Sequence, residues 1–143
     1  MTDKHTKMAA QFVANIPHAN ALGMTVSEIG EGKAVMALPY NSDFIGDPQT
    51  GVIHGGAVSA LMDTCCGAAV MCHPSSPGGT ATIDLRIDYM RAATPGQTLT
   101  TTAHCYHITR SVAFVRAITT DEDTTLPVAT ATGAFTVEGR RGV

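Results

Sequence analysis

The chain has 143 residues, a length that suits one domain with a single hydrophobic core. Hydrophobic residues make up 44% and charged residues only 15%, so we expect part of the apolar surface to be covered by a second copy of the chain. The net charge of −3, with nine Lys and Arg residues and no basic run, argues against nucleic acid as a partner.

The N-terminal residues and the cysteines bear on the cellular compartment. The polar N-terminus shows no signal peptide, and no segment approaches the ~18 apolar residues that a membrane span requires. The four cysteines, Cys65, Cys66, Cys72 and Cys105, form neither a CxxC pair nor a disulfide framework of the secreted type. We therefore expect four reduced thiols packed as small hydrophobic residues, a cytoplasmic protein and no contact with membranes.

The first predicted elements are a helix, a hairpin and a loop. Residues 5–16 place apolar side chains at helical spacing until Pro17 interrupts the pattern. Alternating runs at 24–29 and 33–38 flank a Gly-Glu-Gly turn and predict a β-hairpin. The Pro-, Gly-, Asn- and Asp-rich residues 39–50 predict a loop that leads to the next helix.

The second half of the chain predicts an enclosed helix and a sheet. Residues 55–71 have apolar side chains at helical spacing and few polar positions, so this helix needs cover on most sides. Four strand-like runs follow between turn signals, and residues 139–143 predict a loose tail. The order of elements predicts one domain over residues 1–143, with an α+β fold in which an antiparallel sheet curls around one long central helix.

Asp63 lies inside the apolar helix with no Lys or Arg three or four residues away on either side. An intrahelical ion pair therefore cannot satisfy the carboxylate. Enzymes prepare bases and nucleophiles by placing a carboxylate in such surroundings. The alternative is a solvent-facing aspartate on a narrow polar stripe.

His54, Gly55 and Gly56 stand at the start of the same helix, where the first N–H groups lack intrahelical acceptors. Glycine lets a ligand atom approach the backbone, and bare N–H groups at a helix N-terminus suit a developing oxyanion. The alternative is a pair of glycines that only turns the chain into the helix, with His54 as a structural hydrogen-bonding residue.

The spacing along the helix favours a site made by two chains. Gly56 and Asp63 are seven residues apart, or roughly 10 Å at ~1.5 Å per residue. Groups that act on one carbonyl must each come within about 3 Å of it or of the attacking water. Two antiparallel copies of the helix would bring the N-terminus of one to Asp63 of the other, so a catalytic role for both groups implies a homodimer.

The stretch GVIHGGAVSALMDTCCGAAV, followed by TIDLRIDYMRAATPG, resembles the hotdog-fold acyl-CoA thioesterases of the phenylacetate-degradation type. The shared pattern is HGG, an acid nine residues after the histidine, and the strand DLRIDYMR, and the similarity covers roughly residues 15–138. It implies a hotdog fold, a dimer whose two sheets join, and a pairing of dimers into a tetramer. It also implies hydrolysis of an acyl-CoA thioester without metal or bound cofactor.

The resemblance assigns roles to five residues of the chain. Asp63 matches the acid that activates water or attacks the thioester carbonyl. Gly55 matches the backbone donor to the thioester oxygen, Gly56 sits beside it, and His54 matches the histidine that orients the thioester. Thr82 falls where relatives carry a hydroxyl that helps to hold the nucleophilic water.

One departure from the family pattern lies before the HGG triplet. Many relatives have an Asn there, whereas this chain has Asp47, Pro48 and Gln49. The sequence leaves open whether Asp47 or Gln49 takes over its part, and Gln49 is kept as a substrate-binding candidate.

Three further residues are candidates for binding the substrate. Arg91 and Arg110 are placed as relatives place the cations for the phosphates of coenzyme A, with ordinary surface charge as the alternative. Tyr89 is a candidate for the wall of the acyl pocket and equally for the core. His104 and His107 form HxxH, but residues three apart on a strand point to opposite faces, so no metal site is expected.

Two other functions stay open. A hotdog dehydratase or hydratase needs a histidine close to an acid, and His54 and Asp63 of one chain are nine residues apart. A non-catalytic acyl-CoA binding protein on the same fold would have no need of the HGG triplet and the acid together. The identity of the acyl group cannot be read from the sequence.

Overall fold

The computed structural model describes residues 4–140. It contains three α-helices and a short 3-10 turn, namely α1 (Lys4–Ala14), α2 (Pro17–Leu22), α3 (Gly55–Met71) and η1 (Ser42–Phe44). The strands of the main sheet are β1 (Thr25–Gly30), β2 (Lys33–Leu38), β6 (Thr82–Tyr89), β7 (Leu99–Ile108), β8 (Val112–Thr120) and β9 (Ala129–Thr136). Two short pairs lie beside it: β3 (Ile45–Asp47) with β4 (Val52–Ile53), and β5 (Pro77–Gly79) with β10 (Glu138–Arg140).

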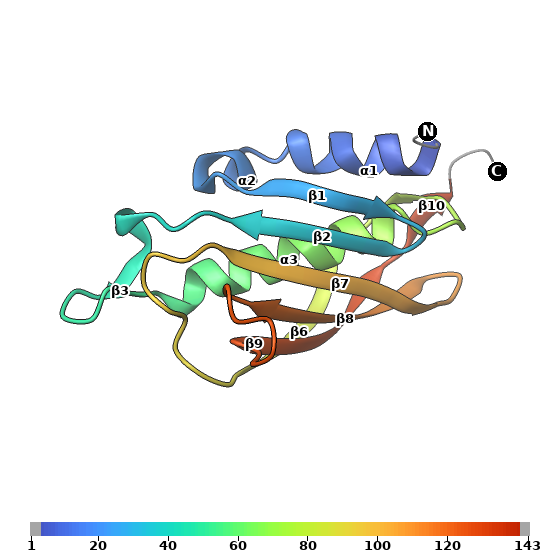
Figure 1. Cartoon of the computed structure of the whole chain (residues 1–143). Coiled ribbons are helices and arrows are strands. Elements are labelled where there is room, and N and C mark those ends of the chain that lie inside the picture. The colour runs from blue at the N-terminus through green and yellow to red at the C-terminus, as the bar shows by residue number, and fades with distance from the viewer. Residues whose placement is uncertain (1–3, 141–143) are drawn as a thin grey trace.

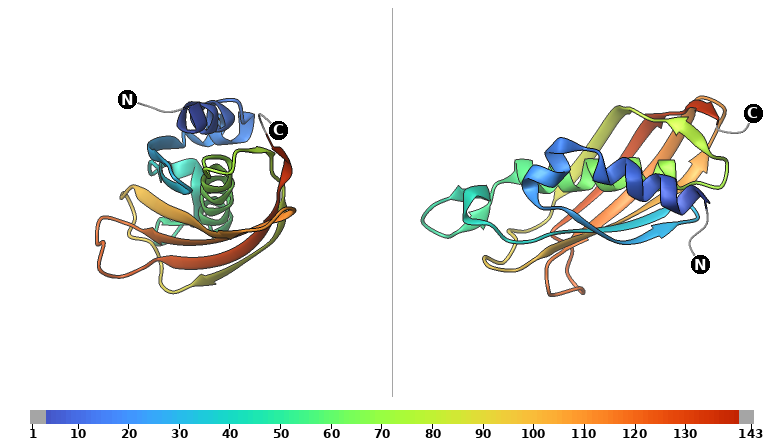
Figure 2. Two further views of the ribbon diagram at one scale, coloured as in Figure 1. Left: turned by 90° about the vertical axis from the view of Figure 1, so that its right-hand side faces the viewer. Right: turned by 90° about the horizontal axis from the view of Figure 1, so that it is seen from above.

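The six strands form one antiparallel sheet in the order β1-β2-β7-β8-β9-β6, and the sheet curls around α3 (Figures 1 and 2). Ten residues of α3 are buried, because small and apolar side chains cover nearly its whole circumference. Each fully buried Val or Leu side chain contributes roughly 1.5–3 kcal/mol to folding. The α+β architecture expected of a hotdog fold, with a central helix at 55–71, is confirmed.

The N-terminal region contains two helices where the sequence predicted one over residues 5–16. Helix α1 ends at Ala14, and Pro17 begins α2 instead of only ending a helix. Proline suits the first helical position, because the N–H that it lacks has no intrahelical acceptor there. The two helices cover α3 on the side away from the sheet (Figure 2).

Strand β6 is an edge strand of the sheet and contains a β-bulge between Thr82 and Asp84. A strict alternation places Thr82 on the opposite face from Leu85 and Ile87. The bulge inserts an extra residue, so Thr82 instead faces α3 together with these two side chains. Ile83 is displaced to the exterior and is 54% exposed.

Strand β7 contains a similar bulge between Cys105 and His107. In the register of the sheet, His104 pairs with Arg116 and His107 with Phe114, all on the face turned away from α3. The statement that His104 and His107 point to opposite faces is therefore wrong, because the bulge shifts the alternation by one residue.

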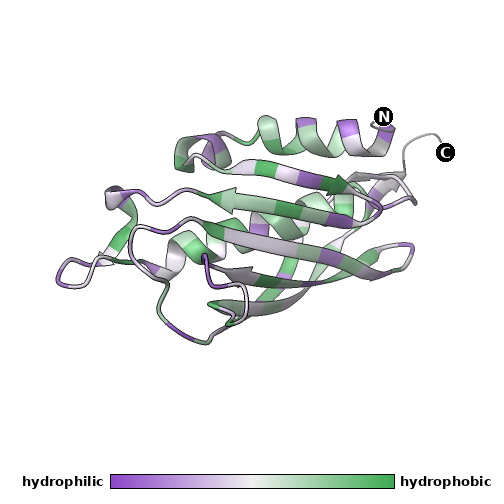
Figure 3. Cartoon of the chain, in the orientation of Figure 1, coloured by the Kyte–Doolittle hydropathy of each residue, from purple (hydrophilic) through white to green (hydrophobic). Residues whose placement is uncertain are grey.

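The chain ends differently from the sequence-based prediction. Gly139 and Arg140, the first residues of the predicted loose tail 139–143, belong to β10, and the rest of that tail lies outside the described residues. Figure 3 shows hydrophobic residues along the sheet and α3, whereas many of the polar ones lie in the connecting loops. Over residues 4–140, no helix is both long enough and apolar enough to cross a membrane.

Candidate active site

Asp63 and Thr82 meet between the middle of α3 and the start of β6. The Thr82 hydroxyl donates a hydrogen bond of 2.7 Å to Oδ1 of Asp63. The carboxylate is partly exposed, and among residues 4–140 no cation forms an ion pair with it. A neutral hydroxyl fixes the orientation of the carboxylate without neutralising it, which leaves Oδ2 available to a water molecule or a substrate.

The start of α3 is organised by His54. Its Nδ1 accepts a hydrogen bond of 2.8 Å from the Gly56 N–H, and its carbonyl accepts one of 3.0 Å from the Ala57 N–H. Because Nδ1 is an acceptor, the neutral ring carries its proton on Nε2, which can donate to a ligand. Within the described part of the chain, the Gly55 N–H has no acceptor. The structure therefore gives Gly55 the free donor and Gly56 a capping role.

Of the two glycines, only Gly56 is required by its contacts within the chain. Neither has a positive φ, so backbone conformation alone does not demand glycine at these positions. A Cβ on Gly56 would lie 2.8 Å from Nδ1 of His54 and would disrupt the cap. A Cβ on Gly55 would meet only the Tyr89 ring, at an ordinary distance of 3.5 Å. The contacts around Gly55 thus tolerate a Cβ, whereas those around Gly56 do not.

Tyr89, at the far end of β6, also contacts the start of α3. Its hydroxyl donates a hydrogen bond of 3.0 Å to the Gly55 carbonyl, while its side chain stays 52% exposed. The peptide between Gly55 and Gly56 is therefore held at both ends, by Tyr89 at its oxygen and by His54 at its N–H. Substrate binding by Tyr89 stays a prediction, and its hydroxyl has a positioning role in this structure.

Gly55 and Asp63 of one chain do not meet at one point. They lie eight residues apart on a continuous helix, which separates them by about 12 Å along its axis. Strand β6 contacts both, through Tyr89 and Thr82 at its two ends. One chain therefore holds two half-sites, each with its own supporting side chain.

A cavity of about 220 Å³ adjoins Asp63. It lies between α3, the N-terminal helices and the start of β6. Its polar lining is His18, Asp63, Thr64, Thr80 and Thr82, and its apolar lining includes Phe12, Ile16, Gly67 and Phe135. No sequence pattern indicated that the N-terminal helices line this cavity, because their apolar spacing is that of an ordinary packed helix.

Asp47 and Gln49, in the loop before the HGG triplet, have different surroundings. The Asp47 carboxylate accepts the Gln49 N–H at 3.0 Å, and the Asp47 carbonyl accepts the N–H groups of Thr50 and Gly51. Asp47 therefore serves the turn, and the Gln49 side chain is exposed at the projecting end of the β3–β4 hairpin (Figure 1). Sequence reasoning missed Gly46, where a Cβ would lie 2.9 Å from Cα of His54. The only signal was a glycine in a loop.

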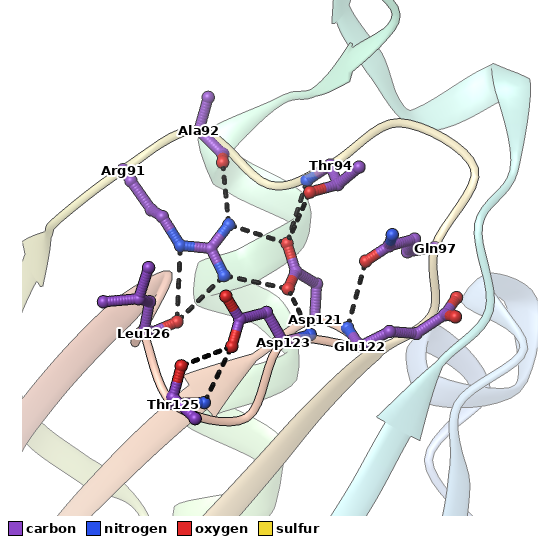
Figure 4. Close-up of polar contacts among 9 residues, drawn as sticks. All are labelled: Arg91, Ala92, Thr94, Gln97, Asp121, Glu122, Asp123, Thr125 and Leu126. Atoms are coloured by element: carbon purple, nitrogen blue, oxygen red, sulfur yellow. Dashed lines mark hydrogen bonds and ion pairs between the residues drawn. The ribbon is translucent and has the colours of Figure 1, made fainter.

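Arg91 makes a buried ion pair with Asp121 (Figure 4). Its two Nη atoms donate to the Asp121 carboxylate at 2.7 and 2.8 Å, and its remaining bonds go to the carbonyls of Leu126 and Ala92. The guanidinium holds the pKa of Asp121 well below its ordinary value, with further hydrogen bonds from Thr94. All guanidinium nitrogens thus have acceptors within the protein, so Arg91 has a structural role in this structure.

Arg110 lies in the turn between β7 and β8 and is exposed. Arg91 precedes β7 and Arg110 follows it, so the two cations lie at opposite ends of that strand. One chain does not bring them together. Arg110 remains the candidate for the phosphates of coenzyme A, and Arg91 would have to break bonds within the fold to take that role.

A long helix wrapped by a large antiparallel sheet is the architecture of the hotdog fold. The model of the Thioesterase superfamily matches residues 50–128, more than half of the chain. The chain belongs to the thioesterase superfamily, and the prediction of an enzyme that hydrolyses thioesters is confirmed at that level.

Three relatives illustrate the similarity. A solved protein from Pseudomonas aeruginosa is 38% identical with a TM-score of 0.82, and the match covers 92% of this chain and 98% of that one. The medium/long-chain acyl-CoA thioesterase YigI of Escherichia coli is 27% identical over 88% of each chain. The E. coli PaaI protein from the phenylacetic acid degradation operon shares the fold, with 23% identity, a TM-score of 0.85 and 98% of both chains covered. The predicted resemblance is confirmed for family and fold.

Proposed function

We propose that the protein hydrolyses acyl-CoA thioesters to a free acid and coenzyme A at two sites shared across a homodimer. The observation that carries this proposal is the unpaired Gly55 N–H at the start of a helix whose middle holds the Thr82-bound carboxylate of Asp63. Membership of the thioesterase superfamily and the similarity to an acyl-CoA thioesterase support the reaction class.

The first step is polarisation of the thioester carbonyl. The Gly55 N–H of one chain binds the carbonyl oxygen, and Nε2–H of His54 orients the thioester beside it. Negative charge develops on this oxygen as the carbonyl is attacked, and a fixed N–H at a helix N-terminus stabilises that charge. The donor belongs to the His54–Gly55 peptide, whose carbonyl accepts the Ala57 N–H, and Tyr89 and the His54 ring hold the next peptide.

Asp63 of the other chain supplies the attack. As a general base it accepts a proton from water while the water oxygen bonds to the carbonyl carbon. The tetrahedral intermediate then collapses, the C–S bond breaks, and the coenzyme A thiolate leaves and takes up the proton. As a nucleophile, Asp63 would instead form an anhydride that water hydrolyses. Both routes use Thr82 to orient the carboxylate and require neither metal nor cofactor.

The edge strand β6 supports the dimer. Its outer edge has no neighbouring strand among the described residues, and its flank exposes Ile83 and Met90 at 54% and 60%. Pairing of two β6 strands would join the two sheets and cover this edge. Two antiparallel α3 helices would then bring Gly55 of each chain toward Asp63 of the other. A dimer of dimers and, from the four free thiols, a cytoplasmic location complete the proposal.

The decisive experiment mixes two inactive variants. Asp63→Asn removes the base and is expected to lower the hydrolysis rate about 10²–10⁴-fold. Gly55→Pro replaces the N–H with a ring carbon, and is expected to lower kcat about 10²–10³-fold. Proline suits the first helical position, and the extended backbone of His54 suits a residue before proline. Gly55→Ala, which keeps the N–H, is the matched control.

In a mixed dimer of these variants, one of the two shared sites has both Gly55 and Asp63 intact. Subunit exchange should therefore restore about a quarter of the wild-type activity to an equal mixture. Activity is followed with a thiol reagent that detects free coenzyme A, over aryl, short-chain and medium-chain acyl-CoAs. Sites within single chains would give no restoration, and full activity of Asp63→Asn would exclude the proposed role of the carboxylate. No turnover of any ester by the wild type would favour a binding protein.

A further inference from the structure

The cavity beside Asp63 has one wall built by the N-terminal helices. Phe12 of α1 and Ile16, which precedes α2, are half-buried and line it. Gly67 of α3 and Phe135 of β9 belong to the same lining, and the Phe12 and Phe135 rings lie next to Gly67. The apolar part of the cavity is therefore enclosed between the α1–α2 segment and the central helix, next to the proposed catalytic carboxylate.

The direction of this cavity follows from helix geometry. Asp63 and Gly67 are four residues apart on α3, so they share one helix face, separated by about 6 Å along the axis. A Cβ placed on Gly67 would lie 3.8 Å from the Phe12 ring and 4.0 Å from the Phe135 ring. The apolar part thus begins one helical turn beyond Asp63, toward the C-terminal end of α3.

The Phe12 ring lies at the far end of this apolar part of the cavity. The ring packs on a second hydrophobic cluster formed by Ala9, Met71 and Cys72, all at most 4% exposed. The ring therefore has core behind it and cannot swing away without loss of packing. An acyl chain whose carbonyl lies at Asp63 would run along Gly67 and end against Phe12.

We propose that the α1–α2 segment is the closed end of the acyl pocket and that Phe12 and Gly67 determine which acyl chains the enzyme accepts. The inference rests on the proposed thioesterase function. The cavity volume of about 220 Å³ leaves room for a small or medium apolar acyl group beside the polar side chains that share the lining. The preferred substrate is therefore an acyl-CoA with a medium-length apolar acyl group, and long-chain esters are excluded by Phe12.

The test is a chain-length profile of kcat/KM, from acetyl-CoA to palmitoyl-CoA with phenylacetyl-CoA as an aryl ester. The wild type should be most active from hexanoyl- to octanoyl-CoA. Phe12→Ala opens the closed end and should move the optimum to longer acyl chains. Gly67→Ala places a methyl group in the pocket and should move the optimum to shorter chains by about one carbon. Both changes are expected mainly in KM.

Matched controls separate a specificity effect from a folding defect. Leu22→Ala removes a half-buried apolar side chain of α2 that packs on the core but does not line the cavity, and should leave the profile unchanged. Phe12→Leu is a milder truncation that should shift the profile in the same direction as Phe12→Ala even if the latter is unstable. Gly67→Ala makes only ordinary contacts and favours the helix, so it should fold.

The two proposals fail in distinguishable ways. Absence of hydrolysis of every ester by the wild type would overturn the proposed function. Hydrolysis with the same chain-length profile in the wild type, Phe12→Leu and Gly67→Ala would overturn only the inference about the pocket. Equal activity of the wild type on palmitoyl-CoA and octanoyl-CoA would likewise contradict a closed end at Phe12.

Discussion

At the scale of single residues, the Tyr89 hydroxyl positions the start of α3, and this role can be tested by removing one oxygen atom. Tyr89→Phe removes only the bond to the Gly55 carbonyl, so the Gly55–Gly56 peptide keeps the His54 anchor alone. Loss of one hydrogen bond of about 1 kcal/mol should lower kcat about fivefold with little change in KM.

The control for this prediction is Tyr106→Phe, which removes an exposed hydroxyl from the outer face of the sheet, where Arg116 stacks on the ring. That variant should keep wild-type kinetics. A raised KM with an unchanged kcat in Tyr89→Phe would instead indicate that Tyr89 binds the substrate directly, as the sequence suggested.

At the scale of elements, packing around α3 buries the four cysteines and raises the pKa values of their thiols. Burial raises the pKa of Cys65 to about 12 and that of Cys105, which lies on β7, to about 11. The pKa values of Cys66 and Cys72 are also raised by burial. Because the thiolate is the reactive form, native protein at pH 8 should release almost no thionitrobenzoate from Ellman's reagent within minutes.

Denatured protein should instead titrate all four thiols, Cys65, Cys66, Cys72 and Cys105, with free coenzyme A as the positive control. Rapid labelling of the native protein would show that α3 opens readily. The prediction also bears on enzyme assays, because a protein with unreactive thiols does not consume the reagent that detects coenzyme A.

The elements also show where sequence reasoning succeeds and where it fails. The central helix and the positions of Asp63 and Gly55 on it were predictable, because apolar periodicity and helix-end chemistry are local. The contact between Thr82 and Asp63 depends on a β-bulge that no residue type in the strand predicts. Strict alternation would place Thr82 on the face of the sheet turned away from α3. The pairing of Arg91 with Asp121, 30 residues apart, is not encoded in any local pattern, so from the sequence Arg91 could only be a candidate for phosphate binding or a surface charge.

For the whole molecule, the ion pair of Arg91 and Asp121 fastens the end of β6 to the β8–β9 connection (Figure 4). The Asp121 side chain is fully buried, and its pKa is lowered in the folded state by Arg91. A carboxylate with a lowered folded-state pKa stabilises the fold above its unfolded pKa of about 4 and loses that contribution as the pH falls further.

Asp121→Asn should therefore lower the free energy of unfolding at pH 7 by about 1–2 kcal/mol, because it removes the partner charge of a guanidinium that stays partly exposed. The same variant should lose less stability than the wild type as the pH falls below about 4. Thermal unfolding between neutral and acidic pH measures both effects. Glu122→Gln, at an exposed acid of the same turn, should behave like the wild type. An equal acid sensitivity of the wild type and Asp121→Asn would contradict the assignment.

Strand β6 carries Thr82 at one end and Tyr89 at the other, and its free edge is the proposed junction of the two sheets. In that dimer, β6 supports both half-sites and also forms the junction between the subunits. Only the associated dimer is therefore active, and the fraction of active enzyme equals the fraction of dimer. Specific activity should then depend on enzyme concentration, falling steeply upon dilution below the dimer dissociation constant and returning with mass action. The cell would thereby set the turnover of the enzyme partly through its abundance.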